Sequence, residues 1–247
     1  MNGLAWTKET IRTLEKYTPR EAYDLVIYDN GSTDGTVEYL KTVNAHIIYS
    51  HVNTGVAISR NECIRYALAQ GCYSHVVFIH NDMLFTKDWF TISMRVLSSL
   101  QPNSVLGIAN ILGQDTISLT DDQRDNIAVA LSNNKIGFAN LHPVFYPVRL
   151  FTDVGLLDES YLQSECEDVD FNVRIHNTGY NITATNAACV FHYLGMVRMK
   201  LKNNFEIRNK NLNMFLKKHG KETLDRWNKA VKSIIMVEGC PWTRYGC

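Results

Sequence analysis

The sequence predicts an α/β domain with a mixed, mainly parallel sheet flanked by helices, and three observations support this fold class. Apolar runs bounded by turn residues alternate with helical patterns from Leu25 to His80. The run from His75 to His80 is apolar almost throughout, which is typical of a central parallel strand buried on both faces. The chain has 247 residues, 45% of them hydrophobic, which suits one globular domain or one domain with a small appendage.

The predicted elements follow one another in βα order. Leu25–Tyr28 forms a strand, a helix follows over about residues 34–41, and residues 45–49 form the next strand. The helix over residues 56–70 has apolar residues at a spacing of four and Gly71 as its C-terminal cap. A later helix extends to about Asn177 and ends at Gly179.

Two regions differ in character from this pattern. Residues 101–147 contain weak strands punctuated by glycines, which is typical of an insertion beside a site. From Arg198 to Lys232, eleven Lys or Arg residues stand against three acidic residues, so residues 198–247 are expected to form a basic helical appendage and tail. Such a charge run is either a solvated helix face or an element that faces phosphates.

The whole-chain charge and the apolar pattern exclude several classes of protein. Lys plus Arg and Asp plus Glu both number 25, so no global field holds the chain on a nucleic acid. No run approaches the roughly 18 apolar residues of a membrane helix, and the N-terminus lacks a signal-peptide pattern. Six scattered cysteines without zinc-ligand spacing suit reduced thiols, so we expect a cytoplasmic protein without a transmembrane segment.

The first group of candidate residues follows the strand that ends at Tyr28. Asp29 stands at the carboxyl end of that strand, where α/β sheets bind ligands and where a carboxylate can accept hydrogen bonds from a base or sugar. Asp34 suits the cap of the next helix. The alternative is an ordinary turn with a cap, because Asn, Gly, Ser and Asp are the usual turn residues.

The second group is His80, Asn81 and Asp82, at the end of the most apolar strand. A carboxylate at such a strand tip is a hard oxygen ligand that could hold a divalent cation against a diphosphate. The alternative is that Asp82 caps the helix that follows.

The third group consists of four carboxylates between Glu165 and Asp170, at the start of a predicted helix. Crowding of like charges raises pKa values and the helix dipole lowers them, so the group can be tuned as a base; the alternative is a solvated acidic first turn. His192 closes a later strand-like run, and its alternative role is that of a core histidine.

Seven ordered blocks resemble glycosyltransferase family 2, the inverting nucleotide-diphospho-sugar transferases of the GT-A fold, with a rhamnosyltransferase-like character. The blocks are Asn2-Gly3-Leu4 with Thr7 and Thr10, VIYDNGSTDGT (26–36), NTGVAISRN (53–61), FIHND (78–82), GLLDE (155–159), EDVDFNVR (167–174) and VFHYLG (190–195). The resemblance implies a GT-A domain over residues 1–197, with a nucleotide-binding half (1–100) and an acceptor and catalytic half (101–197).

The resemblance also implies residue roles. Asp168 looks like the catalytic base and Glu167 like its acceptor-orienting neighbour. Asp82 and His192 look like the residues that hold Mn²⁺ or Mg²⁺ against the diphosphate. The residues expected to bind the nucleotide-sugar are Asp29, Asn30, Ser32, Asn53, Gly55, Arg60 and Asn81.

The implied function is inverting transfer of a sugar from a UDP- or dTDP-linked donor to a glycan or glycolipid acceptor by direct displacement, with possible peripheral membrane contact through the basic segment. The alternative is a non-catalytic nucleotide- or carbohydrate-binding relative, either a pseudoenzyme or an N-terminally truncated fragment. A dinucleotide dehydrogenase is disfavoured, because the G-x-G-x-x-G fingerprint is missing.

Two positions depart from the family pattern. The metal motif reads His80-Asn81-Asp82 in place of two aspartates that flank one residue, so metal binding depends mainly on Asp82, the diphosphate and His192. The family begins with a short apolar strand before its first Asn-Gly, whereas this sequence begins at Met1-Asn2-Gly3, so we expect the usual first strand to be missing. The remaining strands then close the gap, another chain supplies the strand, or the protein is a weakened relative.

Overall fold

The computed structural model describes residues 1–247 apart from 113–115, 133–140, 164, 194–203 and 236–247. The described helices are α1 (Leu4–Tyr17), α2 (Thr36–Leu40), α3 (Val56–Gln70), α4 (Trp89–Ser98), α5 (Asp121–Ser132), α6 (Leu150–Asp153), α7 (Glu167–Asn177), α8 (Asn204–His219) and α9 (Lys221–Ile235), with short 3₁₀ helices at Arg20–Ala22 and Thr116–Ser118. The described strands are β1 (Val26–Asn30), β2 (His46–Ser50), β3 (His75–Phe78), β4 (Met83–Leu84), β5 (Ser104–Leu112), β6 (Leu141–Pro147) and β7 (Asn181–His192).

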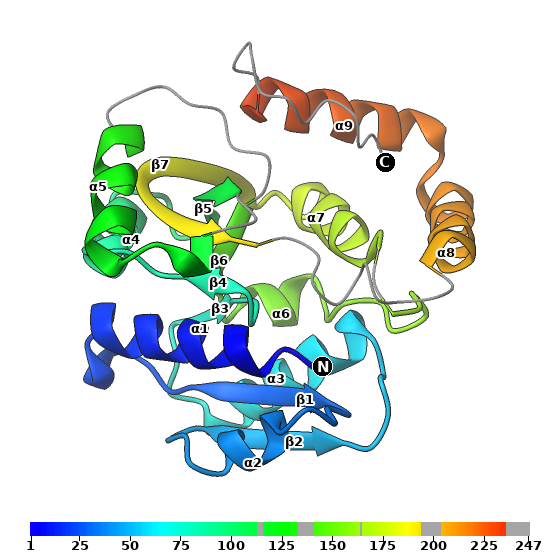
Figure 1. Ribbon diagram of the computed structural model, residues 1–247. Coiled ribbons are helices and arrows are strands. Elements are labelled where there is room, and N and C mark those ends of the chain that lie inside the picture. The colour runs from blue at the N-terminus through cyan, green and yellow to red at the C-terminus, as the bar shows by residue number, and fades with distance from the viewer. Residues whose placement is uncertain (113–115, 133–140, 164, 194–203, 236–247) are drawn as a thin grey trace.

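The strands form two separate sheets, with helices packed around both (Figure 1). β1 and β2 pair in parallel as a two-stranded sheet, with Val26 opposite His46. The larger sheet has the order β3-β6-β5-β7-β4, and only its β5–β7 pair is parallel. The predicted mixed α/β fold is therefore confirmed, although antiparallel pairs outnumber parallel ones among the described strands.

Helix boundaries agree closely with those expected from local sequence signals. α3 spans residues 56–70, and Gly71 ends it in the left-handed conformation with φ of 69°. α7 ends at Asn177, two residues before Gly179. Asp34 precedes the cap position of α2, and its carboxylate accepts hydrogen bonds from the backbone N–H groups of Thr36 and of Leu4, the first residue of α1. One carboxylate therefore serves the starts of two helices.

Two predictions about strands were wrong. The run at 75–80 was predicted to be a central parallel strand buried on both faces, but β3 lies at the end of its sheet, pairs only with antiparallel β6 among the described strands, and is mostly half-buried. Residues 101–147 were expected to form an insertion, but β5 is the middle strand of the larger sheet. Val105, Leu106 and Ile108 of β5 are fully buried, so this region builds the core.

Two apolar clusters form most of the core. One lies between α3, α6, α7 and the sheet and contains Ile64, Phe151 and Phe171. The other lies between α1, α4 and the sheet and contains Phe85 and Trp89. Large aromatic side chains therefore fix both layers of helices to the strands, which holds the strand ends in place.

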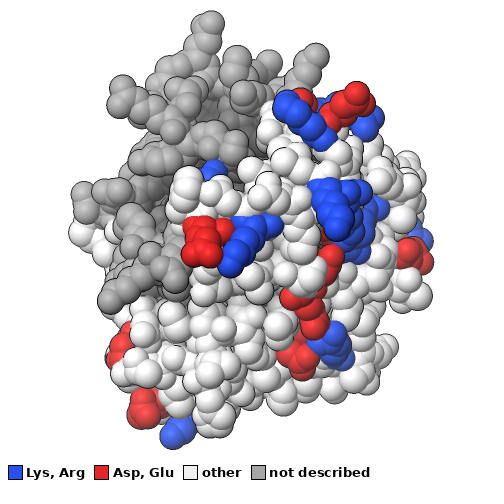
Figure 2. Space-filling view, turned by 90° about the vertical axis from the view of Figure 1, so that its right-hand side faces the viewer, with Lys and Arg blue, Asp and Glu red and all other residues white. Residues whose placement is uncertain are grey.

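The described part of the C-terminal basic segment consists of α8 and α9. Lys210, Lys218 and Lys221 each pair with an acidic residue, and Figure 2 shows basic and acidic side chains intermixed on this face. This arrangement agrees with a solvated, ion-paired helix face. Within the described ranges, no helix is both long enough and apolar enough to cross a membrane.

Candidate functional site

The carboxyl end of β1 forms a tight polar loop. Asp29 is buried, and its carboxylate accepts hydrogen bonds from the backbone N–H and the hydroxyl of Ser32, at 2.9 and 2.5 Å. The Ser32 hydroxyl in turn accepts a hydrogen bond from the N–H of Asn2. Asp29 therefore fixes the loop that follows β1 and faces the same cavity as Met1 and Asp82.

The loop before α3 contacts both β1 and the segment before α7. The Asn30 side chain accepts hydrogen bonds from the N–H and hydroxyl of Thr54, and Asn53 accepts one from the N–H of Gly55. Gly55 has φ of 89°, and a Cβ there would lie 2.9 Å from the backbone nitrogen of Gln163. Only glycine fits this close approach without strain, so Gly55 lets the loop before α3 pack against the backbone of Gln163.

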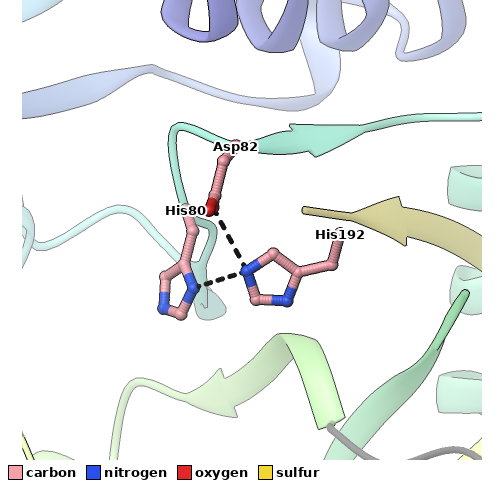
Figure 3. Close-up of side chains that lie close together, drawn as sticks. All are labelled: His80, Asp82 and His192. Carbon is pink, nitrogen blue, oxygen red and sulfur yellow. Dashed lines mark hydrogen bonds and ion pairs between the residues drawn. The ribbon is translucent and has the colours of Figure 1, made fainter. Parts of the chain in front are cut away.

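Three side chains from distant parts of the chain meet beyond β3 (Figure 3). Nε2 of His192, at the end of β7, lies 3.2 Å from a carboxylate oxygen of Asp82 and 3.1 Å from Nδ1 of His80. One ligand atom from each of the three residues lies within 4.8 Å of the others. Among the described residues this is the group of histidines and carboxylates arranged to hold a metal ion.

Arg60 determines where the protons lie in this cluster. Its guanidinium is 2.7 Å from Nε2 of His80 and can only donate, so the neutral ring of His80 carries its proton on Nδ1. That proton points at Nε2 of His192, which must accept it. Nε2 of His192 and the Asp82 oxygen are then two facing acceptors. One carboxylate and one unprotonated imidazole nitrogen fit a divalent cation, which removes their repulsion.

Two buried histidines at this site, His80 and His142, have lowered pKa values. Burial, followed by the neighbouring His142 and then the charge of Arg60, lowers the pKa of His80 well below its usual value. His142, whose ring centroid is 4.4 Å from that of His80, has its pKa lowered mainly by burial as well. Metal ligation requires unprotonated imidazole nitrogen, so these pKa values favour a cation.

The carboxylates of α7 lie on the other side of Arg60. Glu167 is only 5% exposed, and its Oε2 has no hydrogen-bond partner among the described residues. Burial, followed by the negative charge of Asp168, raises the pKa of Glu167 to about 8, while Arg60 opposes this rise. Asp168 is half-buried, and its carboxylate accepts a hydrogen bond from the N–H of Val169. Adjacent carboxyls with such different surroundings can serve as a proton donor and a base.

The segment before α7 has an unusual backbone. Gln163, Glu165 and Cys166 all have positive φ values, of 51°, 88° and 69°. Each such residue costs about 1–3 kcal/mol unless its surroundings hold it, and such strain concentrates at functional sites. The Gln163 carbonyl accepts a 2.6 Å hydrogen bond from the N–H of Val56, the first residue of α3.

α8 holds the same segment from its other side. The buried side chain of Asn211 donates to the carbonyl groups of Leu162 and Glu165 and accepts from the N–H of Leu162. Asp170 is fully buried, and its carboxylate lies 2.6–2.9 Å from basic side chains of α7 and α8, namely Arg174, Lys218 and His219. α8 therefore fixes both the strained segment and the first turn of α7.

Five of the eleven sequence-predicted site residues line one cavity, and others support the loops beside it. Asp29, Asn30, Arg60, Asn81 and Asp82 all line it. The Asn81 amide donates a hydrogen bond to the hydroxyl of Thr7 in α1. The Asn53 side chain accepts a hydrogen bond from the N–H of Gly55 within its own loop. Sequence reasoning placed His80 in the metal motif without giving it a role of its own, and it did not mention His142. The FIHND block contains the signal for His80, but no local pattern marks His142, which precedes a proline inside β6.

The mixed α/β fold, with an acid and histidine cluster at the strand ends and paired carboxylates opposite it, defines the class of GT-A glycosyltransferases. The particular family follows from the sequence. The profile described as Glycosyl transferase family 2 matches residues 1–143, and the chain belongs to this family. No curated protein matched the chain.

Solved structures agree with this fold. GalNAc-T7 with UDP, GalNAc and Mn²⁺ has a TM-score of 0.58 at 12% identity over 91% of this chain and 54% of its own. The mannosyltransferase PcManGT from Pyrobaculum calidifontis with GDP-Man and Mn²⁺ has a TM-score of 0.57 at 15% identity, and the match covers 80% of this chain and 55% of its own. S. aureus TarS 1-349 has a TM-score of 0.56 at 15% identity, and the match covers 94% of this chain and 80% of its own. The chain thus spans about half the length of the first two structures.

Proposed function

We propose that this protein transfers a sugar, with inversion, from a UDP- or dTDP-linked donor to a glycan or glycolipid acceptor. The observation that carries the proposal is the position of Arg60, which contacts His80 in the histidine cluster and whose charge opposes the rise in the pKa of Glu167 beside Asp168. Donor-side and acceptor-side groups are therefore neighbours, as direct displacement in a single step requires.

On the donor side, the family resemblance assigns Asp29, Asn30, Ser32, Asn53, Gly55, Arg60 and Asn81 to the nucleotide-sugar. The cavity that contains Asp29, Arg60 and Asp82 supports this assignment. Asp82 and His192 would hold Mn²⁺ or Mg²⁺, which supplies positive charge opposite the leaving diphosphate. Arg60 adds a fixed positive charge on the same side.

On the acceptor side, Asp168 takes the proton from the attacking hydroxyl. The raised pKa of Glu167 keeps that carboxyl largely protonated at neutral pH, so Glu167 can donate a hydrogen bond to the acceptor and does not compete for its proton. The two carboxyls therefore have different roles despite being adjacent in sequence. No covalent intermediate is needed in this reaction.

The proposal also includes a cytoplasmic protein with peripheral membrane contact through residues 198–247, where a glycolipid acceptor would be met. The many cationic residues of α8 and α9 support such contact, and their ion pairs oppose it. Flotation with anionic vesicles tests this part separately: the protein should co-float with the vesicles at low salt, and failure to do so removes membrane contact from the proposal.

Titration calorimetry with UDP, dTDP and GDP, each with and without Mn²⁺, tests the donor site. One nucleotide should bind in a metal-dependent manner, and Asp82→Asn should weaken that binding by roughly tenfold or more. Glu159→Gln serves as the matched control, because Glu159 lies on the surface beside Arg65. If no nucleotide binds to the folded protein under any condition, the donor assignment is wrong.

A non-catalytic nucleotide-binding relative is the second candidate. It is favoured by the edge of β1 beside Asp29, since β1 pairs with β2 and with no other described strand. Nucleotide binding without sugar transfer or donor hydrolysis, unchanged in Asp168→Asn, would support this candidate over an enzyme.

A further inference from the structure

Two buried asparagines tie the segment that leads into α7 to its neighbours. Asn61 of α3 accepts a hydrogen bond from the N–H of Leu157 and donates one to the carbonyl group of the same residue. Asn211 of α8 makes the same pair of hydrogen bonds to Leu162 and donates a further one to the carbonyl group of Glu165. Both asparagine side chains are shielded from solvent. Of the two ties, the one nearer to α7 therefore comes from α8, which lies beside α7 in Figure 1.

The backbone that Asn211 holds is in an unfavourable conformation. Glu165 and Cys166 have φ of 88° and 69°, in the left-handed region that residues other than glycine rarely adopt. Such a backbone persists only where surrounding contacts hold it. The hydrogen bonds of Asn211 supply contacts of this kind at Leu162 and Glu165, on either side of Gln163, whose φ is also positive. Without Asn211, we expect the segment to relax towards ordinary φ values.

The Glu167 carboxyl lies directly beyond this backbone, where α7 begins. It is buried, and its Oε2 has no hydrogen-bond partner among the described residues. The charged groups that act on it are Asp168 of the same helix and Arg60 of α3, and Glu165 stands two positions before it. A buried carboxyl oxygen without a partner would gain free energy by turning to solvent. The inward position of Glu167 therefore depends on contacts that fix the start of α7.

The contacts of Asp170 with α8 do not fix this start by themselves. The Asp170 carboxylate meets Lys218 and His219 and so holds the first turn of α7 against α8. These contacts restrain a side chain inside the helix, whereas the positive φ angles lie before the helix and can change while Asp170 stays in place. The hydrogen bonds of Asn211 act on the backbone before the helix. Asn211 therefore restrains what the contacts of Asp170 leave free.

We propose that Asn211 is a positioning residue of the candidate site: its hydrogen bonds hold the entry to α7 in the left-handed conformation and so keep the Glu167 carboxyl turned inward beside Asp168. α8, which belongs to the basic C-terminal segment, then acts on the acidic pair through the backbone of another segment. The consequence for turnover rests on the proposed function, but the consequence for the position of Glu167 does not.

The titration of the Glu167 carboxyl tests the proposal without requiring activity. It is followed by ¹³C NMR in protein labelled at the glutamate carboxyl carbons, and Glu167→Gln identifies the signal. Asn211→Ala removes all three hydrogen bonds to the segment. Phe215→Leu is the matched control, because Phe215 is fully buried on α8 and packs against Tyr161 and Val173, so the change weakens the packing of α8 and leaves Asn211 in place. The thermal midpoints of both variants are measured, so that their titrations are compared at a known loss of stability.

The Glu167 carboxyl of the parent should titrate with a pKa of about 8. Asn211→Ala should lower this pKa by about one pH unit or more, because the carboxyl gains solvent and loses the burial that raises its pKa, whereas Phe215→Leu should leave it within about 0.3 of the parent value. Asn211→Ser, whose hydroxyl can replace one hydrogen bond, should give a smaller fall and decides the matter alone if Asn211→Ala does not fold. The proposal is overturned if the Asn211 variants titrate like the parent, if the control shifts equally, or if the parent itself titrates near the ordinary glutamate pKa of 4.5.

Turnover of a nucleotide-sugar provides a second readout, with UDP-glucose and dTDP-rhamnose as probe donors. Asn211→Ala should lower kcat by about tenfold or more and change the KM for the donor by less than about twofold, because Asn211 acts on the acceptor-side carboxyls. A raised KM with an unchanged kcat, or an equal fall of kcat in Phe215→Leu, would contradict the positioning role. If the parent turns over neither donor, the proposed function fails for these donors, and the titration of Glu167 still decides the role of Asn211.

Discussion

The pKa of Glu167 makes the stability of the protein depend on pH in a defined way. Its carboxyl has a pKa of about 8 in the folded protein against 4.5 as a reference, so the folded state holds the proton more tightly. Its contribution to stability is fully present below about pH 4.5 and is lost as pH rises towards 8. Integrated between about pH 5.5 and about pH 8.5, this loss is about 3 kcal/mol.

Glu167→Gln isolates this effect, because the amide has nearly the same shape and no charge. The free energy of unfolding, measured by urea denaturation across this pH range, should fall less in the variant than in the parent, and the difference should grow to about 3 kcal/mol at the alkaline end. Asp168→Asn is an informative companion, because the charge of Asp168 is the second cause of the raised pKa and its removal should reduce the slope. If the free energies of parent and Glu167→Gln run parallel from acid to alkaline pH, the reasoning about Glu167 is refuted.

Three further changes test the loops around the site. Gly55→Ala should lower the free energy of unfolding by about 2 kcal/mol, because its Cβ meets the backbone of Gln163 at positive φ; a value near zero in urea denaturation would contradict that contact. Asp170→Asn should lower the free energy of unfolding by about 3 kcal/mol, because it removes a fully buried charge that pairs with Arg174 and Lys218, and an unchanged thermal midpoint would contradict this. Arg60→Lys should lose the contact with His80 and shift the imidazole NMR signals, whereas signals identical to the parent would show that the guanidinium does not set the tautomer.

Local signals in the sequence predicted helices better than strand partners. The bounds of α3 follow from a spacing of four between apolar residues and from Gly71, all within one stretch of chain. The run at 75–80 is equally apolar whether it is central or at an edge, so its antiparallel pairing with β6 could not be read from it. The glycines of residues 101–147 suggested an insertion with weak strands, although the buried side chains of β5 make it the middle strand of the larger sheet.

The site was predictable where order along the chain carried information. Asp82 and His192 are 110 residues apart, and only the family resemblance suggested that they meet. The contact between Arg60 and His80 and the packing of His142 depend on how β3 and β6 pair. The raised pKa of Glu167 results from burial, which the crowded acidic sequence alone does not show.

The contacts of Asn211 set a minimum length for a working chain. During synthesis, every candidate site residue has been made once His192 is added, but the strained segment before α7 still lacks the three hydrogen bonds that Asn211 makes to it. Asp170 likewise lacks Lys218 and His219 until α8 is complete. The contacts that hold the first turn of α7 and the segment before it are therefore complete only once α8 has been synthesised and has docked.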